Sequence, residues 1–166
     1  MSNNYFVIGF RKVKTIEEYK NKIVGHNNRN RNYKNRINID TSKSKDNIIL
    51  SELKYRTATE LIDTANQIIK QENIETKKKN EGIEDKKKLE KLRRGLKKGS
   101  AFGFEILIDC SKIEGWENKD YINYLQDAND WLQNKFKGQE VLSSVIHLDE
   151  GKPHLHLTFS YFNTDL

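Results

Sequence analysis

Apolar and polar residues alternate with the two-residue period of β-strands in five stretches of the chain. The first, residues 5–13, places Phe6, Ile8 and Phe10 on one face and is rich in β-forming residues. Residues 102–109 repeat this pattern, and residues 47–53 match it more weakly. The last two stretches, 141–147 and 154–161, flank a turn, and alternation in the former groups Leu142 with Ile146.

Other segments have the helical period instead. Thr15-Ile16-Glu17-Glu18 has the form of a capping box and predicts a short helix that Gly25 ends. Residues 57–70 predict an amphipathic helix, and residues 120–136 predict another with a wide apolar stripe that includes Trp131. Residues 30–46 are too polar to pack and indicate a loop. Residues 72–98 are rich in lysine and glutamate and predict a solvated, charged helical excursion.

Strands separated by helices and closed by a hairpin predict an α+β fold, an antiparallel sheet with helices packed on one face. We expect the apolar strand faces to be covered by the helices and the other face to be open for a ligand. No linker divides the chain, so residues 1–166 predict a single domain.

The final hairpin carries the strongest chemical signal. Pairing 141–147 with 154–161 brings His147 beside His154 and His156, which share one strand face. Three imidazoles on a rigid hairpin leave positions of a divalent cation open for water or substrate. Asp149 and Glu150 lie at the rim, where a carboxylate orients a ligand histidine or handles a proton. The alternative, ordinary surface histidines around a turn, is disfavoured by three histidines and two carboxylates within ten residues.

Composition limits the kinds of partner and the cellular compartment that we expect for this chain. The net charge is +6 and the pI is about 9.2, so an acidic polymer is expected, nucleic acid before membrane. No apolar run approaches the length of a membrane span, and the N-terminus lacks a signal peptide, which predicts a cytoplasmic protein. Cys110, the single cysteine, is predicted to be a small buried residue at a strand end.

The fourth histidine, His26, follows Gly25 and precedes a basic, asparagine-rich run. One interpretation is a solvated helix end, and the other is a histidine beside a phosphate-binding surface. The basic residues of that run are Arg29, Arg31, Lys34 and Arg36. A second basic stretch, residues 91–98, could also touch a nucleic-acid backbone, although such a run is usually solvated surface.

These motifs resemble those of one family. Residues 147–156 match completely the motif H-x-D-E-x-x-P-H-x-H, the third motif of the MobV-type relaxases. These are the Mob/Pre plasmid mobilisation and recombination proteins within the HUH endonuclease superfamily. The first motif of that family, H-N-x-R, is matched by His26-Asn27-Asn28-Arg29, and a weaker S-x-x-N by Ser44-Lys45-Asp46-Asn47.

The resemblance implies a metal-dependent endonuclease that nicks and rejoins one strand of plasmid origin-of-transfer DNA, single-stranded or hairpin. His26 would be the nucleophile, linked covalently to the DNA 5′-phosphate, with Glu150 orienting or deprotonating it. Asp149 would support a metal ligand, and the two carboxylates remain interchangeable at this stage. The implied metal is Mn²⁺ or Mg²⁺, held by His147, His154 and His156. Arg29, and with it Arg31, Lys34, Arg36 and Asn47, would contact DNA.

The chain departs from that family in ending soon after the third motif. Relatives usually continue into more catalytic sequence and a C-terminal region for oligomerisation or membrane association. An excised domain and a compact variant both remain open, and an oligomer would form through that missing region. We expect no membrane contact within this chain.

Three other functions remain as alternatives. A rolling-circle replication initiator or a transposase of the same superfamily usually employs a tyrosine on a helix after the metal motif, whereas Tyr121 and Tyr124 come before it. A non-catalytic single-stranded DNA-binding module would not need the histidines. A hydrolase of small phosphate esters would leave the basic loop unexplained.

Overall fold

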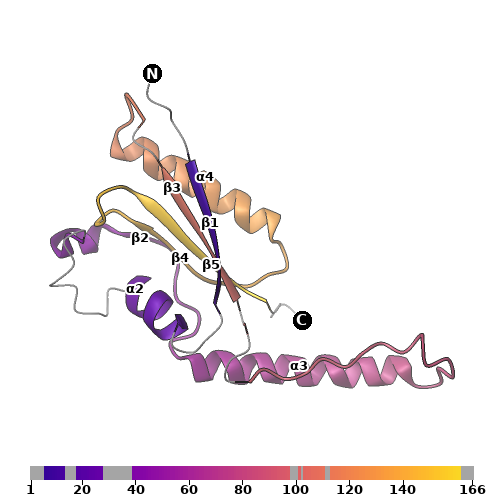
Figure 1. Ribbon diagram of the computed structural model, residues 1–166. Coiled ribbons are helices and arrows are strands. Elements are labelled where there is room, and N and C mark those ends of the chain that lie inside the picture. Colours follow the sequence, from indigo (N-terminus) through magenta and orange to yellow (C-terminus); the bar gives the residue numbers. More distant parts are fainter. Residues whose placement is uncertain are drawn as a thin grey trace.

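The computed structural model describes residues 6–13, 18–27, 39–97, 101, 103–110 and 113–161, which form one antiparallel sheet with helices around it (Figure 1). The strand order is β1-β3-β5-β4-β2, and every neighbouring pair is antiparallel. The strands are β1 (Phe6–Val13), β2 (Ile48–Ser51), β3 (Gly103–Cys110), β4 (Val141–His147) and β5 (His154–Ser160). The antiparallel α+β fold expected from the sequence is confirmed. Cys110 ends β3 and is buried, as predicted.

One face of the sheet is covered by α4 (Asn118–Lys135), which lies across β4 and β5. Leu125 and Leu132 of this helix pack against Ile106, Ile146 and Leu157. Trp131, which the sequence placed in the same stripe, is 62% exposed, so that assignment was wrong. At 100° per residue, Trp131 lies about 80° around the helix from Tyr121, beyond the edge of the buried stripe.

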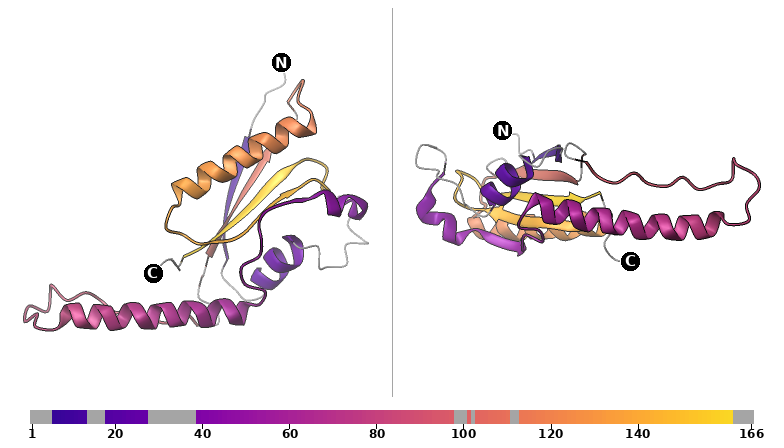
Figure 2. Two further views of the ribbon diagram at one scale, coloured as in Figure 1. Left: turned by 180° about the vertical axis from the view of Figure 1, so that it is seen from behind. Right: turned by 90° about the horizontal axis from the view of Figure 1, so that it is seen from below.

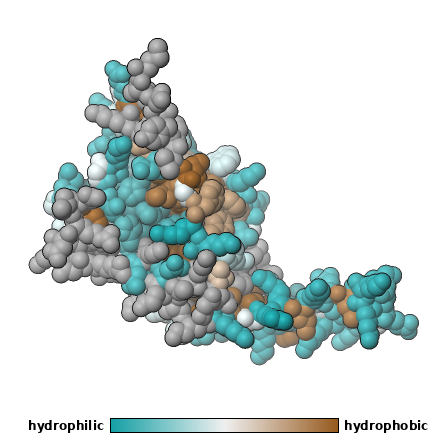
Figure 3. Space-filling view, in the orientation of Figure 1, coloured by the Kyte–Doolittle hydropathy of each residue, from teal (hydrophilic) through white to brown (hydrophobic). Residues whose placement is uncertain are grey.

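The edge strand β1 is only partly covered. Ile8 and Phe10 are 55% and 66% exposed, although we expected the apolar strand faces to be covered by helices. That expectation was wrong for β1 because α4 crosses β4 and β5 and leaves this edge uncovered. The brown atoms near the centre of Figure 3 show apolar side chains reaching this surface.

The opposite face of the sheet receives a short helix that starts as a π-helix, η1 (Tyr19–Val24), and continues as α2 (Gly25–Asn27). The prediction that Gly25 ends this helix was wrong. Glycine disfavours a helix by only about 1 kcal/mol, and tertiary contacts hold the segment: the Tyr19 hydroxyl donates to the Tyr55 carbonyl at 2.5 Å, and Asn27 Nδ2 donates to Ser143 Oγ at 3.2 Å. Residues 15–17 of the predicted capping box lie outside the described residues.

A β-bulge in β4 explains a further difference. Val141 pairs with Phe159 and Ser143 with Thr158, so Leu142 is an extra residue on this strand. Such an insertion reverses the faces on either side of it. Leu142 therefore packs in the cluster of Tyr19 and Ile23, whereas Ile146 lies beneath α4. The prediction that Leu142 and Ile146 share a face was wrong.

The longest helix, α3 (Ala58–Asn80), begins where predicted, with Thr57 as its N-cap, and continues ten residues beyond the predicted end. Its first turns pack on the body through Leu61, Ala65 and Ile69. The rest projects from the sheet, and the chain then returns beside it in extended form (Figures 1 and 2). We call residues 66–97 the arm. Of the described helices, none is long and apolar enough to cross a membrane.

Three asparagines of α3 hold the returning segment. Each amide both donates to and accepts from the backbone of one residue: Asn66 pairs with Leu96, Asn73 with Arg93, and Asn80 with Glu90. The spacings match physically, because seven helical residues rise about 10.5 Å and three extended residues about 10 Å. We call these six hydrogen bonds the asparagine ladder.

The asparagine ladder predicts a pattern of amide protection. Replacing Asn73 with Ala removes two hydrogen bonds, each contributing about 0.5–1.5 kcal/mol, so the Arg93 amide should exchange at least about fivefold faster. Hydrogen exchange followed by NMR measures this, with the exposed Gln71→Ala in the same helix as the control. Unchanged exchange at Arg93 in Asn73→Ala would show that other contacts hold the segment.

Candidate active site

The four histidines of the chain meet on the sheet face opposite α4. His147 ends β4 and is paired in register with His154, which begins β5, while His156 follows two residues later on the same face. The ring centroids of these three lie 5.1–5.4 Å apart. His26 arrives from α2, and its ring lies 4.9 Å from His147 and 5.0 Å from His156. The structure thus brings together residues that are more than a hundred positions apart in the sequence.

The atoms able to bind a metal form two adjoining groups within the described residues. Nitrogens of His26, His154 and His156 lie within 4.8 Å of one another, and so do ligand atoms of His147, Asp149 and Glu150. The ring of His26 therefore lies as close to those of His147 and His156 as these two rings lie to each other. Because these distances are so similar, a histidine that acts as a nucleophile and histidines that bind a metal would have to be distinguished by their chemistry.

The two carboxylates face different histidines. Glu150 lies between two rings, with Oε1 at 3.4 Å from His26 Nε2 and Oε2 at 3.6 Å from His154 Nε2. Asp149 is 2% exposed, and its Oδ1 lies 3.6 Å from His147 Nδ1. Ser44 donates a 2.6 Å hydrogen bond to the other oxygen of Asp149. Glu150 is thus next to His26, and Asp149 is held beside His147.

Asn47 supports the hairpin from the side. Its Oδ1 accepts a hydrogen bond from the Leu148 backbone at 2.8 Å, and its Nδ2 lies 3.2 Å from His147 Nδ1. Since Oδ1 is used as an acceptor, the Nδ2 group is the one that points at the imidazole. The sequence assigned Asn47 to DNA contact, but in the structure both ends of its amide are engaged within the protein.

His154 is held in a form that can bind a metal. Its Nδ1 lies 2.9 Å from the Lys152 carbonyl, so Nδ1 donates and the lone pair is on Nε2. Burial lowers the pKa of this imidazole below its usual 6.5, although the Lys152 hydrogen bond and Glu150 act in the opposite direction. The ring is therefore neutral at pH 7, as metal ligation requires.

Glu105 was missed as a site residue by the sequence analysis. It lies on β3, is 2% exposed, and its Oε1 accepts from His156 Nδ1 at 2.9 Å, while its other oxygen is ion-paired with Arg11 of β1. Burial would raise its pKa, but the hydrogen bond and charge of His156, together with Arg11, outweigh burial and lower it. A single carboxylate within the apolar stretch 104–108 was the signal available in the sequence.

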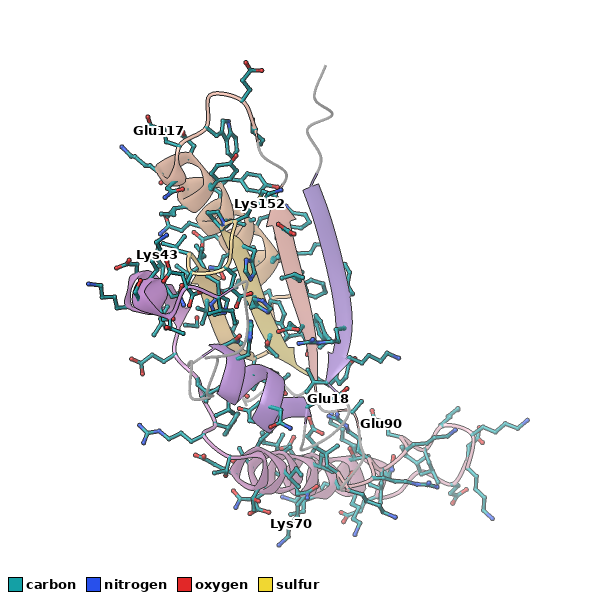
Figure 4. All side chains as sticks on the ribbon, turned by 60° about the vertical axis from the view of Figure 1, so that its left-hand side comes forward. Glu18, Lys43, Lys70, Glu90, Glu117 and Lys152 are labelled. Carbon is teal, nitrogen blue, oxygen red and sulfur yellow. The ribbon has the colours of Figure 1, made fainter. Side chains whose placement is uncertain are left out.

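Part of this site lines one open cavity of about 920 Å³. Its lining includes His26, His154 and His156 with Asp149 and Glu150, and also Lys43 and Lys152. Figure 4 shows these two lysines near one another at one end of the sheet, far from Lys70 and Glu90 of the arm. The basic residues expected to bind DNA, Arg29, Arg31, Lys34 and Arg36, lie outside the described residues.

Comparison with protein-family models gives one match, to the family described as plasmid recombination enzyme, Mob/Pre, over residues 64–165. This is more than half of the chain and includes the whole third motif. The chain belongs to the plasmid recombination enzyme family. The resemblance inferred from the Mob/Pre motifs is therefore confirmed, and so is the prediction of an enzyme.

Solved structures show the same fold. The MobM relaxase domain (MOBV; Mob/Pre) bound to 22-nucleotide plasmid pMV158 oriT DNA, a Mn-bound crystal structure at pH 5.5, matches with a TM-score of 0.64 and 18% identity over 96% of this chain and 72% of that one. The complex with 23-nucleotide DNA at pH 6.5 gives 0.63 and 18% over 96% and 70%. A search of curated proteins found no match. At this identity the likeness establishes the fold.

The buried ion pair at Glu105 predicts pH-dependent stability. A carboxylate with a lowered pKa stabilises the folded state above its usual pKa of 4.5, and this contribution is lost as the pH falls through the folded value. Glu105→Gln should therefore destabilise the protein by roughly 1–3 kcal/mol near pH 7 and by less near pH 3. Urea unfolding at the two pH values measures the difference. An equal effect at both would mean that the charge of Glu105 is unimportant.

Proposed function

We propose that this chain is a metal-dependent relaxase that nicks and rejoins one strand of plasmid origin DNA through a covalent histidine intermediate. The observation that carries the proposal is the convergence of His26, from a separate helix, on the histidines of the third motif, with Glu150 at 3.4 Å. Family membership and the fold of the DNA-bound MobM relaxase domain support it. A cytoplasmic location agrees with a plasmid substrate.

The proposed metal ligands are His147, His154 and His156, and the proposed ion is Mn²⁺ or Mg²⁺. The donor set fits, because Nδ1 of His154 and Nδ1 of His156 donate to protein oxygens and leave Nε2 with a lone pair. For His147, the contacts to Asn47 Nδ2 at 3.2 Å and to Asp149 Oδ1 at 3.6 Å are both made at Nδ1, so Nε2 is the nitrogen proposed for the metal. The MobM crystal structures are Mn-bound. A bound divalent ion would neutralise charge on the scissile phosphate and orient it.

His26 is the proposed nucleophile. A neutral imidazole can attack phosphorus at pH 7, where a tyrosine hydroxyl would first have to lose a proton. Glu150 would hold the ring proton while the unprotonated nitrogen forms the N–P bond and the P–O3′ bond breaks. The ring proton then passes to Glu150, the leaving oxygen takes up one proton from water and becomes a free 3′-OH, and the reverse of these steps rejoins the strand. Because the N–P bond is reactive, no nucleotide cofactor is needed.

Roles for the remaining site residues follow from their contacts. Asp149 would position His147, and Asn47 is better suited to positioning that ring than to contacting DNA, since its amide is engaged within the hairpin. The DNA contact proposed for Arg29 rests on the family resemblance, and those proposed for Arg31, Lys34 and Arg36 rest on the positive charge of the run that follows His26.

A tyrosine-dependent replication initiator or transposase is less well supported. Tyr121 and Tyr124 are on α4, which covers the sheet face opposite the histidines. Tyr19 donates its hydroxyl to Tyr55 within the core. Among the described residues, these tyrosines offer no hydroxyl to the histidine cluster.

The proposed nucleophile can be tested with Mn²⁺ and single-stranded or supercoiled DNA carrying a candidate plasmid origin. We expect the wild type to form an acid-labile protein–DNA adduct, visible on a denaturing gel. His26→Ala should lose the adduct but still bind Mn²⁺ in calorimetry, whereas His154→Ala should lose both. Tyr124→Phe is the control and should react normally. An adduct in His26→Ala would identify another nucleophile, and DNA binding without cleavage in every version would indicate a binding module.

The supporting role of Asp149 predicts a change in metal affinity. Removing a carboxylate that orients a ligand histidine typically costs 10–100-fold in metal affinity, so Asp149→Asn should weaken Mn²⁺ binding by about that factor. Calorimetry measures it, and Asp127→Asn, an exposed carboxylate on α4, is the matched control. Equal affinity in Asp149→Asn and wild type would exclude Asp149 from positioning a metal ligand.

A further inference from the structure

The arm carries almost all of the excess positive charge of the chain. Residues 66–97 contain eleven lysines and arginines and six acidic residues, so they contribute +5 of the total +6. The arm projects away from the sheet and is mostly hydrophilic in Figure 3. The proposed nicking chemistry uses none of these residues.

The asparagine ladder sets the arrangement of this charge. Residues 90, 93 and 96 all turn their backbone N–H and C=O groups toward α3, so the returning segment repeats every three residues. Residues three apart therefore lie along a common line. Lys91, Arg94 and Lys97 follow this spacing about 10 Å apart, and Lys88 precedes them at the end of a turn in which its backbone N–H donates to Asp85. All four are exposed, and we call these four cations the basic ridge.

The other two rows of the returning segment are ion-paired or apolar. Arg93, in the row that faces the helix, pairs with both oxygens of Glu72, at 2.9 and 2.6 Å. Leu92 and Gly95, in the row beside it, line a surface pocket together with Ile69 and Ile74. A Cβ on Gly95 would come within 3.1 Å of Asn66 Oδ1, so a side chain at this position would require the Asn66 amide to shift slightly. These contacts fix the backbone of the basic ridge before any partner arrives.

The chemistry of the arm fits duplex nucleic acid. Residues 66–97 contain no aromatic residue and no histidine, whereas proteins that hold single strands use aromatic side chains to stack bases. Binding to a duplex needs only cations at phosphates. The nine residue steps from Lys88 to Lys97 extend at most about 30 Å, which is less than one turn of B-DNA. A preformed basic ridge is complementary to a stiff, uniformly charged rod.

We propose that the basic ridge binds the phosphate backbone of duplex DNA next to the single strand that the histidines cleave. This inference rests on the proposed function for the identity of the DNA. It assigns the histidine cavity to the single strand and the arm to the duplex beside it. The contact is independent of base sequence, because the basic ridge offers charge and no base-reading groups.

The test uses the full chain and fluorescence anisotropy. The probes are a duplex of about 30 base pairs with unrelated sequence and one of its single strands, titrated between about 50 and 200 mM salt. The arm variant is Lys88→Gln, Lys91→Gln and Arg94→Gln. The matched control removes the same charge from exposed positions on the opposite side of the sheet: Lys119→Gln, Lys135→Gln and Lys137→Gln. Because all six side chains are exposed, both variants are expected to fold.

We expect the arm variant to bind the duplex about tenfold more weakly than the wild type does. The slope of log affinity against log salt concentration should fall in magnitude by about 2–3, since each lost phosphate contact changes it by about 0.9. The control should match the wild type, and single-strand binding should change much less. An unchanged duplex affinity, an equal loss in the control, or an equal loss for the single strand would each overturn the proposal. The relaxase function is tested separately: it would be refuted if the wild type failed to cleave a short single strand with Mn²⁺. In that case the duplex titration would still show whether the arm binds duplex DNA.

Discussion

The pairing of β5 between β3 and β4 is the constraint on which both the core and the site depend. Leu155, Leu157 and Phe159 face α4 and are fully buried, while His154 and His156 face the other way. The same pairing brings Glu105 of β3 to His156 and His147 of β4 to His154. A slip of one residue would turn the histidines toward α4 and the leucines toward the ligand. The burial energy of the core therefore also maintains the site.

The position of His26 depends on irregularities instead. The bulge in β4 turns both Leu142 and Ser143 toward the short helix: Leu142 packs with Tyr19 and Ile23, and Ser143 accepts a hydrogen bond from Asn27. A regular strand would present only one of them. The bulge thus supplies both an apolar and a polar anchor for the helix that carries His26, and Tyr19 adds a third through Tyr55.

The sequence predicted what depends on neighbours along the chain. The hairpin histidines could be placed together because a single turn separates them, and the strand periods gave the antiparallel fold. Glu105 could not be assigned, since its role requires knowing that β3 lies beside β5 and that β1 brings Arg11. The bulge at Leu142 and the passage of the helix through Gly25 follow from tertiary contacts that outweigh local preference, whereas the exposure of Trp131 follows from its angular position on α4. The predicted end of α3 was ten residues too early, because the residues that hydrogen-bond to the end of this helix, 90–96, come later in the chain, after a turn.

The asparagine ladder also limits how such an arm can vary in length. Inserting one residue in α3 would rotate every later asparagine by 100° away from its partner, and one extra residue in the return segment would move its paired groups out of reach. Only the addition of seven helical residues together with three extended ones restores the match. Arms of this construction are therefore expected to lengthen or shorten in modules of ten residues, with one asparagine in each.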